Sequence, residues 1–506
     1  MSGLEHLFEK LIRYSENDIY PYHMPGHKRK PFGMLPGELS RIDITETDDF
    51  DNLHQPEGIL DSLQREAARL YGAEESFYLV NGSTCGILSA VSCALHEGGH
   101  ILMARNCHRS AYHAVYLRNL RAMYLYPPYL EEYDIYDALE PEEVRRALER
   151  EPDIGAVLVV SPTYEGRISD IRAIADIVHE RGIPLIVDEA HGAHLGLAGD
   201  FPKNSCQLGA DLVIHSVHKT LPALTQTALL HVNGGRIDRG LLRRFLRIYQ
   251  SSSPSYLLMA GIDNALCYIG LQGQEAFGAF RQRFEAMLDR LRGCRHLRFL
   301  TDARDRQDTG KLLISTKQSG LTGKQLYDIL LERYHLQAEM ASTGFVLAMF
   351  TVNDGEEAYR RMTEALLAVD ESLEEGMAGM SEGRAEGGAA PEPLEELRGS
   401  GPHRPGPGAI PLAKAWDMPT EQIALAESEG RYIGEFINLY PPGVPLLVPG
   451  ERMTGELIGM ISEVEEQGLE VQGVGKRKGA GGLWPELYVP AILEEIQDSW
   501  NIYKRH

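Results

Sequence analysis

Two apolar runs that each end in a polar segment constrain the fold of this chain most. The run Ile183–Val187 leads directly into Asp188-Glu189-Ala190-His191, and the run Leu212–His215 leads into Ser216-Val217-His218-Lys219. Other apolar runs of strand length alternate with segments of helical periodicity, namely Leu60–Leu70, Ser76–Val80, Ile101–Ala104, Ala156–Val160 and Ile171–His179. Alternation of this kind predicts an α/β fold, with a mostly parallel sheet flanked by helices and ligands at the carboxyl ends of the strands.

With 506 residues, the chain is too long for one ordinary domain. After Val232 the pattern changes to long helices and then to a smaller α+β stretch that includes Lys311–Ser315 and Phe345–Val352. Between 376 and 408 the sequence is rich in Gly, Pro, Ala and Glu, which is typical of a flexible linker. We therefore expect an N-terminal segment (1–56), a large domain (57–255), its remainder with a small α+β domain (256–375), the linker (376–408) and a C-terminal α+β module (409–506).

Composition excludes several classes of partner. We find no apolar run of 18 residues and no basic-then-apolar leader, so we expect a cytoplasmic protein without a membrane contact. The formal net charge of −23 repels nucleic acid and would attract a cationic small molecule. The six cysteines form no C-x-x-C pair, so neither a metal site nor a disulfide framework is expected.

The pairing of Asp188 with Lys219 points to pyridoxal phosphate. A lysine amine can form a Schiff base with the aldehyde of this cofactor, and a buried carboxylate can keep its pyridine nitrogen protonated, so that the ring becomes an electron sink. Each residue alone has a simpler explanation, since a lone Asp at a strand end is usually a cap and a lone Ser-x-His-Lys is usually a polar loop. Their order on an alternating α/β pattern favours the cofactor.

A phosphate cup is predicted at Asn81-Gly82-Ser83-Thr84-Cys85-Gly86, between a strand and the helix expected from Gly86. Backbone amides and hydroxyls at a helix N-terminus suit a phosphate, although an ordinary N-cap explains Ser83 and Thr84 equally well. Ser216 and His218 would complete the cup. His108 follows the strand Ile101–Ala104 and could stack on the pyridine ring, and Ser161–Gly166 ends another strand at the same edge of the sheet.

With these segments and further motifs along the chain, the sequence closely resembles the bacterial ornithine/lysine/arginine decarboxylase family. The members of this family are pyridoxal phosphate enzymes of fold type I, the aspartate aminotransferase fold. The resemblance spans nearly the whole sequence. Its motifs are His23-Met24-Pro25-Gly26-His27-Lys28, Asp43-Ile44-Thr45-Glu46, Leu53-His54-Gln55-Pro56-Glu57-Gly58, Asn81-Gly82-Ser83-Thr84, Asn106-Cys107-His108-Arg109-Ser110, Pro162-Thr163-Tyr164-Glu165-Gly166, Asp188-Glu189-Ala190-His191-Gly192-Ala193-His194, Ser216-Val217-His218-Lys219, Pro441-Pro442-Gly443-Val444-Pro445-Leu446-Leu447 and Pro449-Gly450-Glu451.

The resemblance implies a role for each matching residue. Lys219 would be the Schiff-base lysine, Asp188 the partner of the ring nitrogen, His108 the stacking imidazole and Ala190 the contact on the other ring face. The phosphate and its surroundings would be held by Ser83, Thr84, Cys85, Ser216, His218 and, from the neighbouring subunit of a homodimer with shared active sites, the segment Ser251-Ser252-Ser253-Pro254, in which we single out Ser252.

The chain also departs from the family. It lacks the N-terminal wing of the long, acid-inducible members, so the resemblance is to the short biosynthetic form, and no large ring assembly is expected. Where relatives carry a segment like Pro-Arg-Glu-Ala-Phe, this chain has Pro411-Leu412-Ala413-Lys414-Ala415-Trp416 after a glycine-rich insertion. Because that region borders the substrate pocket in relatives, the sequence constrains the type of reaction better than it constrains which substrate side chain is preferred.

The expected reaction is decarboxylation of a basic L-amino acid to its amine and CO2, with arginine first, then lysine, then ornithine. Lys219 or His191 would protonate the α-carbon. The alternatives are an aminotransferase or lyase of the same fold, or a non-catalytic paralogue. The cationic end of the substrate needs a carboxylate partner, for which the candidates are Glu427, Glu429, Glu46 and Asp51, although surface charges and helix caps explain such residues as well.

Overall fold

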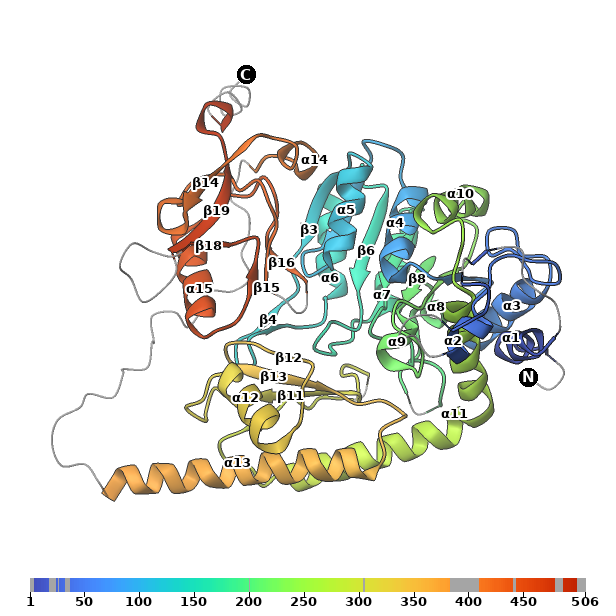
Figure 1. Cartoon of the computed structure of the whole chain (residues 1–506). Helices are drawn as coiled ribbons and strands as arrows, with labels where there is room; N and C mark the ends of the chain where they lie inside the picture. The colour runs from blue at the N-terminus through green and yellow to red at the C-terminus, as the bar shows by residue number, and fades with distance from the viewer. Residues whose placement is uncertain are drawn as a thin grey trace.

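A computed structural model of the chain describes residues 4–17, 24–25, 27–31, 37–199, 201–303, 305–382, 409–439, 443–477 and 486–497. Three parts are visible in Figure 1: the N-terminal half around a large sheet, a small sheet above two long helices, and a C-terminal module. The side chains of 375–382 are not described.

The large sheet has seven strands in the order β1-β9-β8-β7-β6-β2-β3. Only β9 runs antiparallel to its neighbours, so the carboxyl ends of the other six strands meet at one edge. The strands are β1 (Glu75–Leu79), β2 (His100–Ala104), β3 (Arg121–Leu125), β6 (Ala156–Val160), β7 (Leu185–Asp188), β8 (Leu212–His215) and β9 (Ala228–Val232).

Helices cover both faces of this sheet because the strands are apolar on both sides. Alternate residues such as Ile186 and Leu185 belong to opposite hydrophobic cores. One core includes α4 (Gly82–Ala94), α5 (Arg109–Leu117) and α10 (Arg239–Tyr249), and the other includes α6 (Pro141–Arg150), α7 (Ile171–Glu180) and α8 (Ser205–Leu208). A Cβ on Gly86 would lie 2.7 Å from Leu79 Cδ1, so glycine lets α4 approach the sheet closely.

The small sheet is antiparallel, in the order β10-β11-β13-β12. Two long helices, α11 and α13, run side by side beneath it (Figure 1). The elements are α11 (Tyr256–Leu291), β10 (Arg298–Phe299), β11 (Lys311–Ser315), α12 (Gly323–Tyr334), β12 (Met340–Ala341), β13 (Phe345–Met349) and α13 (Glu356–Glu382). One core joins these helices to the N-terminal helices α1 (Leu7–Ser15), α2 (Gly37–Ile42) and α3 (Ile59–Tyr71).

The C-terminal module consists of two three-stranded sheets with the helix α15 (Gly455–Glu466). A two-stranded ribbon, β4 (Tyr129–Leu130) with β5 (Ile135–Tyr136), belongs to the preceding part of the chain. The elements of the module are α14 (Leu412–Ala415), β14 (Thr420–Ala424), the 3-10 helix η2 (Leu425–Glu427), β15 (Ile437–Leu439), β16 (Pro445–Leu447), β17 (Val471–Gln472), β18 (Gly475–Arg477) and β19 (Glu486–Ile492).

The mostly parallel sheet with flanking helices confirms the predicted fold class. The predicted first residue of one helix was wrong. Helix α4 begins at Gly82 and not at Gly86, so Ser83, Thr84 and Cys85 lie in its first turn. Helix α13 continues to Glu382, inside the segment predicted as a linker, and 383–408 lie outside the described residues. The domain boundaries stay predictions.

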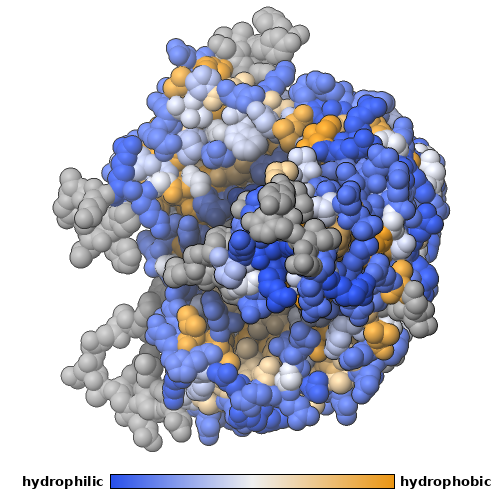
Figure 2. Space-filling model, turned by 45° about the vertical axis from the view of Figure 1, so that its right-hand side comes forward, coloured by the Kyte–Doolittle hydropathy of each residue, from blue (hydrophilic) through white to orange (hydrophobic). Residues whose placement is uncertain are grey.

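Hydrophilic side chains predominate on the face shown in Figure 2, where hydrophobic ones form small separate patches. Among the helices that the structure describes, none combines the length and the apolar character that crossing a membrane requires.

Candidate active site

The carboxyl edge of the large sheet gathers the side chains that the sequence singled out. Asp188 ends β7, and the short helix α9 (Val217–Thr220) begins directly after β8. The loop after β2 carries His108, the loop after β1 leads into α4, and Ser161–Gly166 follow β6. Because these strands are parallel, segments far apart in the sequence meet here.

Asp188 is a buried carboxylate, with 6% of its surface exposed. Its Oδ1 accepts a hydrogen bond from the Ala190 N–H at 3.1 Å. Within the described part of the chain no hydrogen bond reaches Oδ2. Burial raises the pKa of Asp188, while the nearby Lys219 ammonium opposes that rise. A buried carboxylate with an open oxygen is suited to bind a cationic N–H group.

Lys219 lies on α9 within electrostatic reach of Asp188. Burial lowers the pKa of the Lys219 amine, against the opposing charges of Asp188 and Glu339. Its Nζ is 2.9 Å from His191 Nε2. A lysine that loses its proton more easily is a better nucleophile.

His108 is held as a neutral imidazole. It is the N-cap of α5, and its Nδ1 accepts from the Ser110 N–H at 3.2 Å and lies 2.9 Å from Ser110 Oγ. Burial, together with the Lys219 charge, lowers the pKa of His108 to about 4. A neutral ring fixed in this way can stack on a flat cofactor without adding charge.

The N-terminus of α4 faces the N-terminus of α9. Ser216 Oγ donates to Ser83 Oγ at 2.9 Å, and the His218 ring is oriented by an Nδ1 contact of 2.8 Å to the Thr227 carbonyl oxygen. Thr84 is exposed, whereas the buried Cys85 thiol donates to the Gly82 carbonyl at 3.1 Å. A Cβ on Gly82 would meet no atom within 4 Å, so this helix start opens on free space.

These residues fit pyridoxal phosphate. Hydroxyls and free amides at the start of the 13-residue α4 suit its phosphate, the open oxygen of Asp188 suits its ring nitrogen, and the amine of Lys219 suits its aldehyde. Ala190 is buried beside Asp188. Ser252 is exposed, and its neighbour Ser251 donates its backbone N–H to Asn81 Oδ1 of the same chain at 3.3 Å.

Comparison with known proteins decides the family. The family model "Orn/Lys/Arg decarboxylase, major domain" matches residues 5–354, and the model of the C-terminal domain of that family matches residues 412–476. The chain belongs to the Orn/Lys/Arg decarboxylase family. The chain is therefore an amino-acid decarboxylase, which confirms the predicted family and enzyme class.

Individual relatives of the Orn/Lys/Arg decarboxylase family agree. The chain is 33% identical over 476 residues to the uncharacterized protein YaaO of Bacillus subtilis, covering 92% of this chain and 95% of that protein. It is 30% identical over 480 residues to an arginine decarboxylase of the same organism, with the same coverage. The crystal structure of the Francisella novicida lysine decarboxylase LdcF has the same fold, with a TM-score of 0.79 at 17% identity over 97% of this chain and 82% of that chain.

Sequence reasoning missed Lys311 as a residue of this decarboxylase site. It begins β11 of the small sheet, and its Nζ is 2.9 Å from His191 Nδ1. Tyr164 packs edge-on against the same imidazole, with ring centroids 4.7 Å apart. A lysine directly before the apolar residues 312–314 was the available signal.

A buried hydrogen-bonded chain beneath Asp188 was also missed. Glu189 Oε2 contacts His215 Nε2 at 2.7 Å, His215 Nδ1 contacts His231 Nε2 at 3.0 Å, and His231 Nδ1 contacts Ser76 Oγ at 2.6 Å. Burial raises the pKa of Glu189 to about 8. The chain of contacts ties β1, β9 and β8 to the end of β7 and so stiffens the strand end that presents Asp188.

Arg105 anchors the C-terminal module beside the His108 loop. Its guanidinium donates to the Pro445 and Leu446 carbonyls at 2.7 and 2.9 Å and to Glu451 Oε2 at 3.0 Å. Both side chains of the ion pair are almost fully buried. The Arg109 N–H reaches the Gly443 carbonyl at 3.2 Å, so the module borders the site.

We expect Arg105→Met to destabilise the protein by about 3–5 kcal/mol, because it leaves the Glu451 carboxylate buried without its cation. Chemical unfolding measures this. The matched control is Arg360→Met, which removes two exposed ion pairs and should leave the free energy of unfolding close to that of the wild type. Equal losses in the two variants would contradict a structural role for the buried pair.

The four carboxylates considered for the distal end of the substrate differ in their surroundings. Asp51 accepts the backbone N–H groups of Glu57, Gly58 and Leu60 and therefore caps α3. Glu427 and Glu429 are exposed on the C-terminal module. Glu46 accepts from Thr45 Oγ1 at 3.0 Å with Oε2, while its buried Oε1 has no hydrogen-bond partner among the described residues, so Glu46 stays a candidate.

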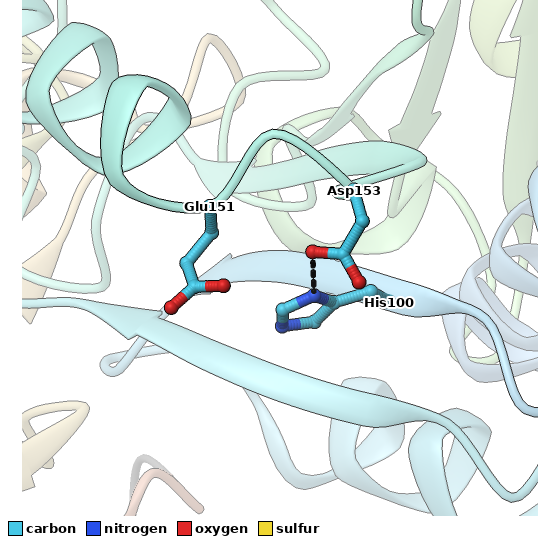
Figure 3. Close-up of side chains that lie close together, drawn as sticks. All are labelled: His100, Glu151 and Asp153. Atoms are coloured by element: carbon cyan, nitrogen blue, oxygen red, sulfur yellow. Dashed lines mark hydrogen bonds and ion pairs between the residues drawn. The ribbon is translucent and has the colours of Figure 1, made fainter.

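His100, Glu151 and Asp153 form a cluster at the opposite edge of the sheet, where β2 begins (Figure 3). His100 Nδ1 is 3.0 Å from Asp153 Oδ1, and Arg121 donates to Asp153 Oδ2 at 2.6 Å. Asp153, in the loop before β6, thus pairs with residues at the starts of β2 and β3, and this ion-pair network explains its place in the cluster without a metal.

Proposed function

We propose that this chain decarboxylates arginine, with pyridoxal phosphate as its cofactor. The observation that carries the proposal is the meeting of Asp188 and Lys219 at one sheet edge, where each shifts the pKa of the other. Lysine and ornithine follow arginine in the expected order of preference. Transamination, or elimination from the substrate side chain, remains the alternative outcome of the test.

Different residues of the site would hold different parts of the cofactor. When bound, pyridoxal phosphate supplies a protonated pyridine ring that withdraws electrons from the α-carbon as CO2 leaves. Asp188 would hold the ring nitrogen, and Lys219 the aldehyde carbon. His108 and Ala190 would lie on the two ring faces, and the phosphate would be bound by Ser83, Thr84, Ser216, His218 and the amides of the first turn of α4, including that of Cys85.

A proton must then reach the α-carbon. Lys219 Nζ and His191 Nε2 are adjacent, so either group can deliver it. The buried His191 has a pKa well below its ordinary value, because burial and the flanking lysines disfavour its charged form. His191 therefore acts as a neutral imidazole that carries one movable proton.

Arginine is supported by charge and by relationship. The charge of Glu339 opposes the burial that lowers the pKa of Lys219 and of Lys311, and Glu165 acts on Lys311 in the same way, so two carboxylates lie on the side of the site toward the small sheet. Tyr164 Oη donates to Glu339 Oε1 at 2.5 Å. A relative that is 30% identical is named an arginine decarboxylase.

The expected result of a substrate comparison is CO2 release from arginine, lysine and ornithine, with kcat/KM for arginine at least about 10-fold above the other two, as one well-placed charge contact gives. Radiometric CO2 release and keto-acid formation are measured in the same reactions. Keto acid without CO2 would identify a transaminase, and a preference for lysine or ornithine would overturn the arginine assignment.

We further propose a homodimer in which the segment around Ser252 reaches the phosphate of the neighbouring subunit. The exposure of this segment supports the arrangement. Sedimentation of the purified protein, with Ser252→Ala to test cofactor affinity, checks it. The cytoplasmic location stays a prediction.

A further inference from the structure

Lys311 is a buried lysine of the small sheet that reaches into the site formed by the large one. Only 2% of its surface is exposed. Space for its stem comes from Gly166, where a Cβ would lie 2.7 Å from Lys311 Cγ, and where φ is +97°. Its Nζ lies 5.3 Å from the centroid of the Tyr164 ring. The geometry directs the amine of Lys311 at one atom, His191 Nδ1.

The imidazole of His191 thus lies between two lysine amines, with Lys219 on Nε2 and Lys311 on Nδ1, each at 2.9 Å. A neutral imidazole has one N–H and one lone pair, and a lysine ammonium has no lone pair. The nitrogen that carries the proton must donate to an amine, so that amine is neutral. With both contacts formed, at most one of the two lysines is charged.

We propose that Lys311 is a positioning residue that takes the proton of Lys219 through His191 and thereby keeps Lys219 a free amine. This inference rests on the proposed function and adds to it the origin of the proton that His191 presents to the substrate. Nothing in the sequence pattern around Lys219 indicates a second lysine.

The transfer balances in protons and charge. In one state Lys219 is an ammonium that donates to Nε2, while Nδ1–H donates to the neutral Lys311 amine. Transfer of one proton from Lys219 to Nε2 and of another from Nδ1 to Lys311 gives a neutral Lys219, an Nε2–H and a charged Lys311. When Nε2 later gives its proton to the α-carbon, Nδ1 takes one back from Lys311, which returns to the neutral amine.

The surroundings of Lys311 suit an amine that changes charge near neutral pH. Burial lowers the pKa of Lys311 to about 8, with the charges of Asp308, Glu339 and Glu165 opposing the decrease and that of Lys219 adding to it. Asp308 is itself paired with His194 at 2.9 Å. The other titratable groups that face His191 are Tyr164, whose ring packs edge-on against the imidazole, and the two histidines His108 and His218. Burial lowers the pKa of both histidines, so neither of them supplies a competing cation at neutral pH.

The test compares full-length Lys311→Met, Lys311→Arg and, as the matched control, Lys317→Met. Lys317 lies just beyond the same strand but pairs with Asp134 at 2.6 Å. Apoprotein is mixed with pyridoxal phosphate, and the rate at which the visible absorbance band appears is measured from about pH 6 to about pH 10. Steady-state kcat and KM are measured on the reconstituted enzymes.

In Lys311→Met, Lys219 should keep its proton, so the midpoint of the pH dependence rises by about one unit and the rate at neutral pH falls about 10-fold. In Lys311→Arg, the guanidinium still donates to Nδ1 but cannot release a proton, so band formation stays near the wild-type rate. In both variants kcat falls about 10- to 100-fold while KM changes little. Lys317→Met should behave as the wild type.

Band formation in Lys311→Met with the wild-type rate and pH dependence would overturn the proposal. If that variant does not fold, Lys311→Arg decides alone, and a wild-type kcat in it would overturn the proposal. Band formation needs no amino-acid substrate, so it tests Lys311 even if wild-type protein releases no CO2 from any basic amino acid, a result that would refute only the proposed function.

Discussion

Lys219→Ala should abolish decarboxylation, with a loss in kcat of at least about 10³-fold, and should at the same time remove the absorbance of lysine-bound cofactor. Both effects have one cause, because the amine that would hold the cofactor at the sheet edge is gone. CO2 release and the visible spectrum of the reconstituted protein measure them.

The matched control is Lys324→Ala, which removes a surface lysine that pairs with Asp328 on α12. It should keep both the spectrum and the turnover. A Lys219→Ala protein that releases CO2 at the wild-type rate would show that another group performs the chemistry.

Asp188→Asn should lower kcat by about 10²- to 10³-fold, which is the cost of removing one preorganised electrostatic partner from an active site. An amide cannot keep a pyridine nitrogen protonated, so the ring would withdraw electrons poorly. Asp289→Asn, a change at an exposed position on α11, is the control.

The unfolding temperature of apo Asp188→Asn distinguishes a loss of electrostatic catalysis from a loss of folded protein. Burial raises the pKa of Asp188 above its unfolded value, so this group favours folding below the unfolded pKa, and that contribution is lost as the pH rises through the folded pKa. The charged carboxylate is therefore unfavourable for folding at neutral pH, and apo Asp188→Asn should unfold at the same temperature as the wild type or at a higher one. A large decrease in the unfolding temperature would indicate that the loss of activity is structural.

The sequence predicts those site residues that lie at the ends of strands. The strand Leu212–His215 was predicted at its observed bounds, and Asp188 ends β7, because an apolar run followed by polar residues marks where a parallel strand leaves the core. Each of these signals is local. Parallel pairing then brings Asp188 and Lys219 to one edge without further information.

The residues that sequence reasoning missed depend on contacts between distant segments. Lys311 meets His191 across 120 positions, and Arg105 meets Glu451 across 346. Neither contact follows from periodicity or a motif, since both depend on how the small sheet and the C-terminal module dock on the large sheet. Asp51 was considered as a partner of the substrate, but its contacts are local, because its carboxylate caps a helix that begins a few residues later in the chain.

The most direct test of the account is to find the lysine that holds the cofactor. Wild-type protein is reconstituted with pyridoxal phosphate, reduced with borohydride and digested, and the modified peptide is identified by mass spectrometry. The account predicts that the phosphopyridoxyl group is on Lys219. Labelling of Lys311 or of any other lysine in place of Lys219, or no labelling, would contradict it.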